Sequence, residues 1–248
     1  MDVSGRGVLV TGGASGIGHA IATRFVDAGG EVLVCGRRVD KLREAQARYP
    51  RIRTRACDLE DPAQRIALAQ WAIRELPSLD VLVNNAGIQQ YPRFADPVDW
   101  NVLHREIAIN FEAQVHLALL LIPHLRSQAH PVIINVSSGL AFVPLARAPI
   151  YSATKAAMHS FTLSLRHQLR DTPIEVIEVA PPGVNTDLGG PGLHTWGVPL
   201  DEFADFVFSE LRKPGIREIA YQFSAQASHA SRQEIDDIFA RMNEPDTR

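Results

Sequence analysis

Short apolar runs alternate with amphipathic stretches along most of this chain, and the alternation restricts the fold more than any other feature. The strand-like runs lie near residues 7–11, 31–35, 52–57, 80–84, 131–137, 174–180 and 217–222. Helical patterns lie between them, near residues 16–28, 39–48, 61–75, 98–127 and 151–170. Strands that alternate with helices predict an α/β fold, a doubly wound parallel sheet of about seven strands with helices on both faces.

The domain organisation follows from what the chain lacks. No interdomain linker, repeat or low-complexity tract interrupts the 248 residues, so we expect residues 1–248 to form a single domain. The stretch 189–199 mixes glycine, proline, histidine and tryptophan after the end of a strand. We expect the segment 189–212 to contain a substrate loop or lid, although a plain long connection is the alternative.

Charge and composition exclude several kinds of protein. A net charge of −3 gives no basic footprint for nucleic acid or an anionic membrane. The longest apolar stretch, Val115 to Leu125, is too short to span a bilayer. Two cysteines, Cys35 and Cys57, make neither a disulfide framework nor a metal site, so no bound metal is expected. A strand begins close to the amino terminus and leaves no room for a signal peptide, so we expect a cytoplasmic protein.

A glycine-rich turn, Thr11-Gly12-Gly13-Ala14-Ser15-Gly16-Ile17-Gly18, joins the first expected strand to the first helix. Such glycines let the backbone approach a pyrophosphate, which then lies at the helix amino terminus. Alone, the glycines could make only a tight turn, but their place in a βαβ unit favours a dinucleotide site in a Rossmann-type fold. The residues expected to hold the cofactor here are Gly12, Ser15, Gly16, Ile17 and Gly18.

The end of the second strand indicates which dinucleotide binds. Sites specific for NAD commonly place an acid there to hold the ribose 2′-hydroxyl, whereas arginine suits a 2′-phosphate. Here Gly36 occupies the position and Arg37 and Arg38 follow it, so a carboxylate is absent and two guanidinium groups are near; this favours NADP and leaves NAD possible, and solvated loop charges are the alternative. Asp58, followed by Leu59, could accept a hydrogen bond from the adenine amino group or cap the helix that begins near Pro62.

Tyr151 and Lys155 are one helical turn apart and share a helix face. A nearby ammonium favours the phenolate, so we expect Lys155 to lower the pKa of Tyr151 into a range suited to proton transfer. Ser138 follows a buried strand at its carboxyl end, where open α/β sheets place their chemistry. Ser137 is the alternative hydroxyl, but successive strand residues face opposite sides, and the spacing favours Ser138. These residues predict an enzyme that moves a proton through Tyr151.

With these motifs in order, the chain from about Gly7 to Leu188 resembles the short-chain dehydrogenase/reductase family. The motifs that carry the resemblance are Thr11-Gly12-x3-Gly16-Ile17-Gly18, Asp58, Asn84-Asn85-Ala86-Gly87, Asn110 and Ser138-x12-Tyr151-x3-Lys155. Local stretches such as Cys35-Gly36-Arg37-Arg38 resemble the branch of oxidoreductases called DltE-like. That label says little about the substrate.

The resemblance implies a role for each motif. Tyr151 would be the general acid in carbonyl reduction and the base in alcohol oxidation, Lys155 would hold the nicotinamide ribose, and Ser138 would orient the substrate oxygen. Asn110 would bind, through its backbone, a water that links Lys155 to solvent. The further cofactor contacts that the resemblance implies are Asn85, Ala86, Gly87, Pro181, Val184 and Thr186.

Two implications concern geometry and assembly. The family usually has glycine where alignment on Thr186 places Pro182, and proline fixes φ and removes an amide donor. We expect cofactor binding to survive through Thr186 and the Val184 backbone. In the family, helices equivalent to 98–127 and 151–170 pack against a second subunit, so a homodimer or homotetramer is implied, although the helices alone could be internal.

The resulting hypothesis is an NAD(P)-dependent oxidoreductase that interconverts an alcohol and a carbonyl of a small molecule by hydride transfer. A non-catalytic NADP-sensing regulatory protein on the same scaffold is the alternative, but a sensor has no need of Ser138, Tyr151 and Lys155. An epimerase or dehydratase would need nucleotide-sugar contacts that the sequence does not contain. The substrate itself is not identified by the sequence.

Overall fold

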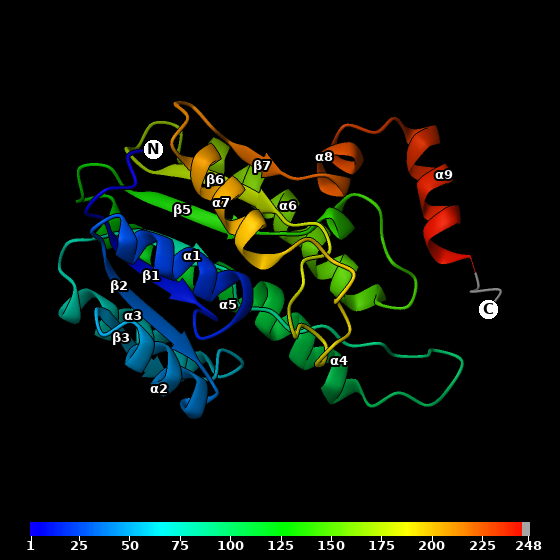
Figure 1. Cartoon of the computed structure of the whole chain (residues 1–248), viewed down its shortest axis with the longest axis horizontal. Helices are drawn as coiled ribbons and strands as arrows, with labels where there is room; N and C mark the ends of the chain where they lie inside the picture. Colours follow the sequence, from blue (N-terminus) through cyan, green and yellow to red (C-terminus); the bar gives the residue numbers. More distant parts are fainter. Residues whose placement is uncertain (245–248) are drawn as a thin grey trace.

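The computed structural model of the chain describes residues 1–244. One seven-stranded sheet runs through it in the order β3-β2-β1-β4-β5-β6-β7, and every neighbouring pair is parallel (Figure 1). The strands are β1 (Gly7–Thr11), β2 (Glu31–Gly36), β3 (Ile52–Ala56), β4 (Leu79–Asn84), β5 (Val132–Val136), β6 (Glu175–Ala180) and β7 (Glu218–Ala220). The strand order reverses between β1 and β4, so the predicted doubly wound Rossmann-type sheet is confirmed.

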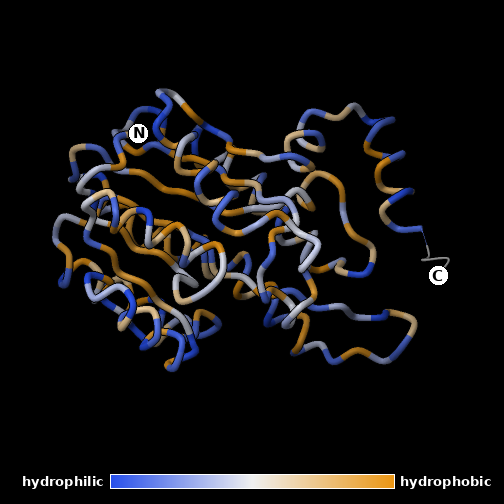
Figure 2. The backbone as a smooth tube through the Cα atoms, in the orientation of Figure 1, coloured by the Kyte–Doolittle hydropathy of each residue, from blue (hydrophilic) through white to orange (hydrophobic). Residues whose placement is uncertain are grey.

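Helices cover both faces of this sheet. The long helices are α1 (Gly16–Asp27), α2 (Val39–Arg48), α3 (Pro62–Glu75), α4 (Trp100–Ile107), α5 (Ala113–Leu125), α6 (Pro149–Gln168), α7 (Leu200–Leu211) and α9 (Arg232–Asn243). Shorter elements are α8 (Phe223–Ser228), the π-helix η1 (Ala108–Glu112) and the 3₁₀ turn η2 (Gly139–Ala141). Figure 2 shows the strands as mainly hydrophobic segments enclosed by these helices.

Two hydrophobic cores lie on opposite faces of the sheet, because successive strand residues point to opposite sides. Val8 belongs to the core beneath α1 and α7, together with Phe25 and Phe203. Leu9, the next residue, belongs to the core beneath α3, α5 and α6, together with Leu68 and Leu117. The two cores hold all the central strands in place, and the carboxyl ends of these strands therefore form a rigid edge.

The carboxyl-terminal part of the segment 189–212 is a core helix. Residues of α7 pack on α1, and Phe203 and Val207 are fully buried. The irregular connection is therefore confined to residues 189–199, and only these remain a candidate for a lid. Beyond the sheet, α8 and α9 form a small separate hydrophobic cluster (Figure 1). Its buried residues are Val143, Ala227 in α8 and Ile238 in α9.

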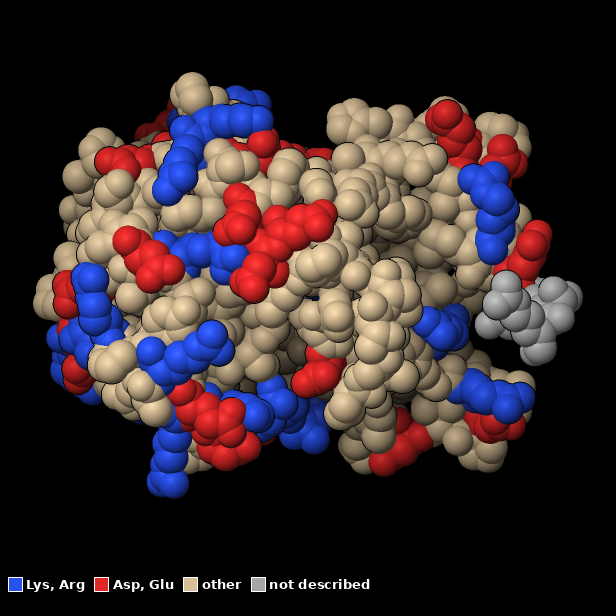
Figure 3. Space-filling model, viewed as in Figure 1, with Lys and Arg blue, Asp and Glu red and all other residues tan. Residues whose placement is uncertain are grey.

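One helical run, Trp100–Leu125, is long and apolar enough to cross a membrane by length and composition alone. Leu117, Leu121 and Leu125 in this run are fully buried against the sheet, which is the behaviour of a core helix. On the face of the molecule in Figure 3, acidic and basic side chains are interspersed. That face therefore carries no single-sign surface of the kind that attracts nucleic acid or anionic lipid.

Candidate active site

A cavity of about 1180 Å³ opens at the carboxyl ends of the strands. The expected site residues that line it are Gly12, Ser15, Gly16, Ile17, Arg37, Arg38, Asp58, Leu59, Asn85, Ala86, Gly87, Ser138, Tyr151, Lys155, Pro181, Val184 and Thr186. Gly18 and Asn110 do not line the cavity and lie behind its wall. The residues predicted from separate motifs thus meet at the switch point of the sheet, where α/β folds bind ligands.

The glycine turn between β1 and α1 is too tightly packed to admit a side chain at Gly18. A Cβ on Gly18 would lie 2.6 Å from the carbonyl oxygen of Gly12 and would overlap the Asn85 amide. That amide donates to the Thr11 carbonyl oxygen at 2.9 Å, so it cannot easily move away. Ser15 makes no side-chain cap on α1, which leaves the first amides of the helix without that partner. This cradle fits the pyrophosphate of a dinucleotide.

The adenosine end of the cavity carries the two arginines. Arg38 donates from Nη2 to the Ser15 hydroxyl at 2.6 Å, and neither Arg37 nor Arg38 forms an ion pair within residues 1–244. Asp58 lies on the cavity wall, and its Oδ1 accepts from the Glu60 amide at 3.1 Å. Asp58 does not cap α3, because Asp61 does so by accepting from the Ala63 amide.

Three buried side chains converge at the other end. Tyr151 is 7 % exposed, Lys155 is 3 % exposed and Ser138 is 7 % exposed. The Lys155 Nζ lies 5.6 Å from the centre of the Tyr151 ring and donates to the Val136 carbonyl oxygen at 2.8 Å. Pro149 lies in the first turn of α6, and Tyr151 and Lys155, four residues apart, are buried on one face of this helix.

Burial dominates the electrostatics of this group. It raises the pKa of Tyr151 above its ordinary value, while the Ser138 hydroxyl lowers it in part. This direction is opposite to the expected lowering by Lys155, because burial of the phenol has the largest effect. Burial also lowers the pKa of Lys155 to about 8, against an opposing effect of Glu178. At neutral pH the phenol is therefore in its proton-donating form.

Asn110 fastens the loop that follows β4. Its Oδ1 accepts from the Ile88 amide at 2.8 Å, and its Nδ2 donates to the Ile88 carbonyl oxygen at 2.9 Å. Nδ2 also lies within 3.2 Å of the Thr154 hydroxyl on α6. Asn110 lies in the π-helix η1, and such bulges interrupt the regular backbone ladder, often at functional sites. The expected backbone contact of Asn110 with a water remains a prediction.

Thr186 and the segment before it border the cavity beside the glycine turn. A Cβ on Gly16 would lie 3.5 Å from the Thr186 side chain, so the segment reaches back to the glycine turn. Val184 forms a β-bridge with Val198, and the Asn185 amide donates to the Val198 carbonyl oxygen at 2.9 Å. The bridge anchors the base of the loop 189–199.

The most exposed aromatic of this loop is Trp196. Its side chain is 69 % exposed, and its Nε1 donates to the Leu193 carbonyl oxygen at 3.1 Å. The ring packs so closely on Gly183 that a Cβ there would overlap it. Trp196 thus lines the cavity while most of the residue faces solvent.

The sequence analysis missed Glu106, which is fully buried in α4 one turn before Asn110. Its Oε1 accepts from the Gln90 amide at 3.0 Å, while its Oε2 has no partner within the described residues. Burial raises the pKa of Glu106 to about 7, and its charge acts on Tyr151. The only signal in the sequence is a carboxylate on the same helix face as Asn110.

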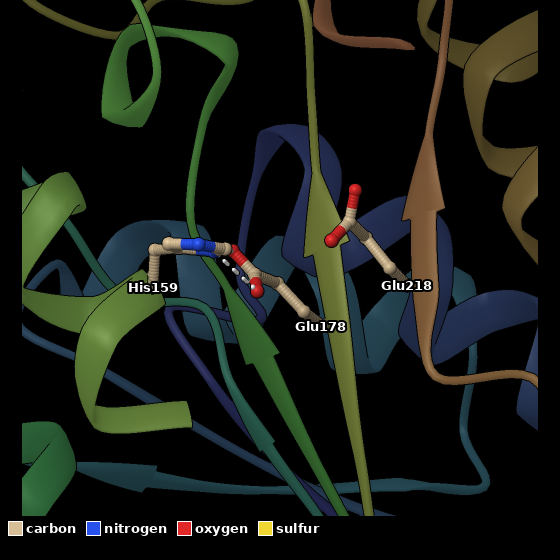
Figure 4. Close-up of side chains that lie close together, drawn as sticks. All are labelled: His159, Glu178 and Glu218. Atoms are coloured by element: carbon tan, nitrogen blue, oxygen red, sulfur yellow. Dashed lines mark hydrogen bonds and ion pairs between the residues drawn. The ribbon is translucent and has the colours of Figure 1, made fainter. Parts of the chain in front are cut away.

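A second missed group lies behind Lys155. Glu178 in β6 is fully buried, accepts from the Ser137 hydroxyl at 2.5 Å and lies 2.9 Å from His159 Nδ1 (Figure 4). Ligand atoms of His159, Glu178 and Glu218 all lie within 4.8 Å of one another. None of these three residues belongs to the motifs that the sequence predicted. An acid inside the apolar run Val176-Ile177-Glu178-Val179 was the overlooked signal.

With the fold and this geometry in place, the comparisons with known proteins define the class. The family model described as short chain dehydrogenase matches residues 6–193, so the chain belongs to the short-chain dehydrogenase/reductase family and is an oxidoreductase. The uncharacterized oxidoreductase DltE of Bacillus subtilis is 45 % identical over 249 aligned residues, which cover 98 % of each chain. Sulfoacetaldehyde reductase 2 of Chromohalobacter salexigens is 34 % identical over 188 residues, 73 % of each chain.

Solved structures give the same class. A short chain dehydrogenase from Burkholderia cenocepacia in complex with NADP has a TM-score of 0.83 at 25 % identity, over 99 % of this chain and 100 % of that one. The 3-ketoacyl-(acyl-carrier-protein) reductase of Brucella melitensis, complexed with NADH, has a TM-score of 0.79 at 26 % identity, over 88 % of this chain and 97 % of that one. The resemblance inferred from the motifs is therefore confirmed, including its DltE-like branch.

Proposed function

We propose that the protein is an NADP-preferring oxidoreductase that interconverts an alcohol and a carbonyl, with Tyr151 as general acid and base. The observation that carries this proposal is the convergence of buried Tyr151, Ser138 and Lys155 at one end of a cavity whose other end is a glycine cradle. Nicotinamide dinucleotides bound to relatives of the same fold agree with that cradle.

The chemistry follows from the positions of the side chains. When bound, the nicotinamide supplies the hydride for the carbonyl carbon. Ser138 donates a hydrogen bond that orients the substrate oxygen, and Tyr151 gives its proton to that oxygen as the alcohol forms. The phenol carries its proton at neutral pH, so Tyr151 is available as the donor in this direction. Lys155 holds the nicotinamide ribose beside Tyr151 and favours return of the proton from solvent.

Arg37 and Arg38 support the preference for NADP. Both lie at the adenosine end of the cavity, and a guanidinium can bind a 2′-phosphate through two parallel hydrogen bonds. Asp58 lines the same end and would accept from the adenine amino group. Asn85, Ala86 and Gly87 would form the wall behind the adenosine.

The substrate side of the cavity is lined mainly by apolar groups, among them Ile88, Leu140 and Leu188. This lining suits small carbonyl compounds with apolar substituents. We propose that residues 189–199 act as the lid over this side. Reaction with an aldehyde, which the name of sulfoacetaldehyde reductase implies for that relative, lies within the same reaction class.

Assembly and location complete the proposal. Leu119 on α5 is 61 % exposed and Leu163 on α6 is 45 % exposed, so both helices offer apolar surface to a second copy of the chain. We propose a homodimer or homotetramer built on these helices, each chain acting as one catalytic domain. Both cysteines are free and buried, which agrees with a reducing cytoplasm.

The test is a panel of carbonyl compounds and alcohols, assayed by nicotinamide absorbance with NADPH, NADH and their oxidised forms. On any substrate that the protein converts, Tyr151→Phe should lower kcat by roughly 10²–10⁴-fold, the usual contribution of general acid–base catalysis. NADPH binding should persist in the variant. The matched control is Tyr49→Phe, since Tyr49 lies at the end of α2 outside the cavity.

Full activity of Tyr151→Phe would refute the catalytic assignment. The regulatory alternative predicts a different result, in which NADPH binds tightly and no compound of the panel is oxidised or reduced. Cofactor-dependent capture of a protein partner would then support the sensor.

A further inference from the structure

Glu178 is a fully buried acid in the middle of β6. Its neighbours along the strand, Ile177 and Val179, are fully buried apolar residues of the sheet. An ionised carboxylate in such a place is strongly destabilising unless other groups compensate its charge. Packing alone would be served equally well by an apolar residue of similar volume, so the acid calls for another reason.

Two side chains hold this carboxylate, one from each side. The Ser137 hydroxyl donates to Oε1 at 2.5 Å, and His159 Nδ1 lies 3.1 Å from Oε1 and 2.9 Å from Oε2. Figure 4 shows His159 on its helix pointing at Glu178 on the neighbouring strand. The hydrogen bond to Glu178 raises the pKa of His159, which favours the ion pair. Both oxygens of Glu178 therefore already have donors.

The backbone relates both of these residues, Ser137 and His159, to Lys155. Ser137 directly follows Val136, whose carbonyl oxygen accepts from the Lys155 Nζ at 2.8 Å. His159 lies one turn after Lys155 on α6, so the two side chains share a helix face. Glu178 is thus the acidic group behind the catalytic lysine, one strand away from the carbonyl that binds it.

We propose that Glu178, held by Ser137 and His159, is a positioning residue that keeps Lys155 in its charged form. The inference rests on the proposed function, because it assigns Lys155 to the nicotinamide ribose and to Tyr151. A negative charge favours the ammonium over the neutral amine, whereas burial favours the amine. In this site burial lowers the pKa of Lys155 to about 8, and Glu178 opposes a further fall.

The other charged and titratable groups around this pair are few. On α6, Lys155 faces Tyr151, and His159 faces Arg166 further along the same helix. On β7, Glu218 is the register partner of Glu178, and its charge acts on His159. Among these groups Glu178 alone raises the pKa of Lys155. Removing the charge of Glu178 should therefore lower the pKa of Lys155.

The experiment compares pH profiles of NADPH binding, by fluorescence, and of kcat in wild type and Glu178→Gln. The amide keeps the shape of the side chain and can still accept from Ser137. Loss of the charge should move the alkaline limb of both profiles to lower pH by about one unit, since the amine form of Lys155 then forms more easily. Binding gives a readout even if no carbonyl substrate is found, which separates this inference from the proposed function.

Three further variants separate charge from structure. Glu178→Met removes the same charge with a side chain of similar volume and should shift the alkaline limb equally. It provides the test if Glu178→Gln does not fold. Glu178→Asp keeps the charge and should leave the limb close to that of wild type. Glu218→Gln is the matched control, because Glu218 lies next to Glu178 in the register and does not act on Lys155.

Several outcomes would overturn the inference. An unmoved limb in both Glu178→Gln and Glu178→Met would show that the carboxylate has only a structural role. An equal shift in Glu218→Gln would show a nonspecific charge effect. Loss of activity on treatment with a chelator, restored by zinc alone, would assign His159, Glu178 and Glu218 to a metal ion instead.

Discussion

The two ends of the cavity are built in different ways. At the nucleotide end, backbone atoms and short side chains leave no room for a Cβ on Gly18, and Gly12 adopts a φ of +66° that favours glycine. At the substrate end, the loop 189–199 presents side chains to solvent, with Leu193 46 % exposed and Trp196 69 % exposed. One end is a rigid cradle set by the sheet, and the other is a loop anchored by a single β-bridge.

The difference teaches which end defines the class of enzyme. Where neighbouring atoms leave no room for a Cβ, only glycine is tolerated. A cradle built from such positions therefore fits one ligand shape. A solvent-exposed loop restricts its residues far less, and loops on a rigid scaffold are where specificity varies. The chemistry that we propose for Tyr151 and Lys155 is then compatible with different carbonyl compounds.

The strongest test of the comparison is Gly18→Ala. The new methyl group would overlap the Asn85 amide and approach the Gly12 carbonyl oxygen to 2.6 Å, so the turn has to open. We expect NADPH affinity to fall at least about 100-fold, because the amides that face the pyrophosphate move with the turn. Isothermal titration with NADPH measures the effect, together with the midpoint of thermal unfolding.

Gly215→Ala is the matched control. Gly215 has φ +70° and open space around it, far from the cavity lining, so an alanine there strains the backbone without touching the cofactor. It should lower the stability by about 1 kcal/mol and leave NADPH affinity unchanged. Equal loss of affinity in both variants would remove the claim that the cradle is the rigid end.

The arginines provide a test of intermediate size. Arg37→Ala should weaken NADPH binding about ten-fold and NADH binding much less, which corresponds to about 1.4 kcal/mol for an exposed charge-assisted contact with the 2′-phosphate. Arg38→Ala should weaken the binding of both cofactors, because it also removes the hydrogen bond to Ser15 at the start of α1. Titration of each variant with NADPH and NADH measures the ratio.

Arg43→Ala on the exposed side of α2 is the control for loss of a positive charge nearby. It should leave both affinities within two-fold or so of wild type, as expected for a screened surface charge. A loss of NADH affinity equal to that of NADPH in Arg37→Ala would reject the preference for NADP.

The cradle could be predicted from the sequence because its signals are local. Glycines between a strand and a helix, and Tyr151 one turn before Lys155, express their geometry within a few residues. The alternation of strands and helices likewise indicated the sheet and most of its helices. Even the preference for Ser138 over Ser137 rests on the two-residue period of a strand.

The buried acids could not be predicted in the same way. Whether Glu106 and Glu178 face solvent or the interior depends on elements that pack on them from distant parts of the chain. The predicted lowering of the Tyr151 pKa was wrong for the same reason, because the spacing to Lys155 contains no information about burial. Helix α7 was taken as part of a lid because its packing on α1 is also a long-range contact.

The smallest expected effect belongs to the loop end of the comparison. Trp196→Ala removes an exposed ring that rests on Gly183 and buries little apolar area. We expect KM for the carbonyl substrate to rise about three- to ten-fold, because a lid that covers the entrance less well retains the substrate for a shorter time. The Kd for NADPH should remain unchanged, since the cradle is held by separate contacts. Steady-state kinetics and cofactor titration measure the two quantities.

Trp100→Ala supplies the control, because Trp100 is 62 % exposed on α4 and does not line the cavity. Its loss should leave KM and the Kd for NADPH unchanged. If Trp196→Ala instead weakens NADPH binding by the same factor as it raises KM, the loop and the cradle form one unit. Val184 and Thr186, which lie between them, would then couple the two. The two ends of the cavity would then not be independent, and both would close together on the cofactor.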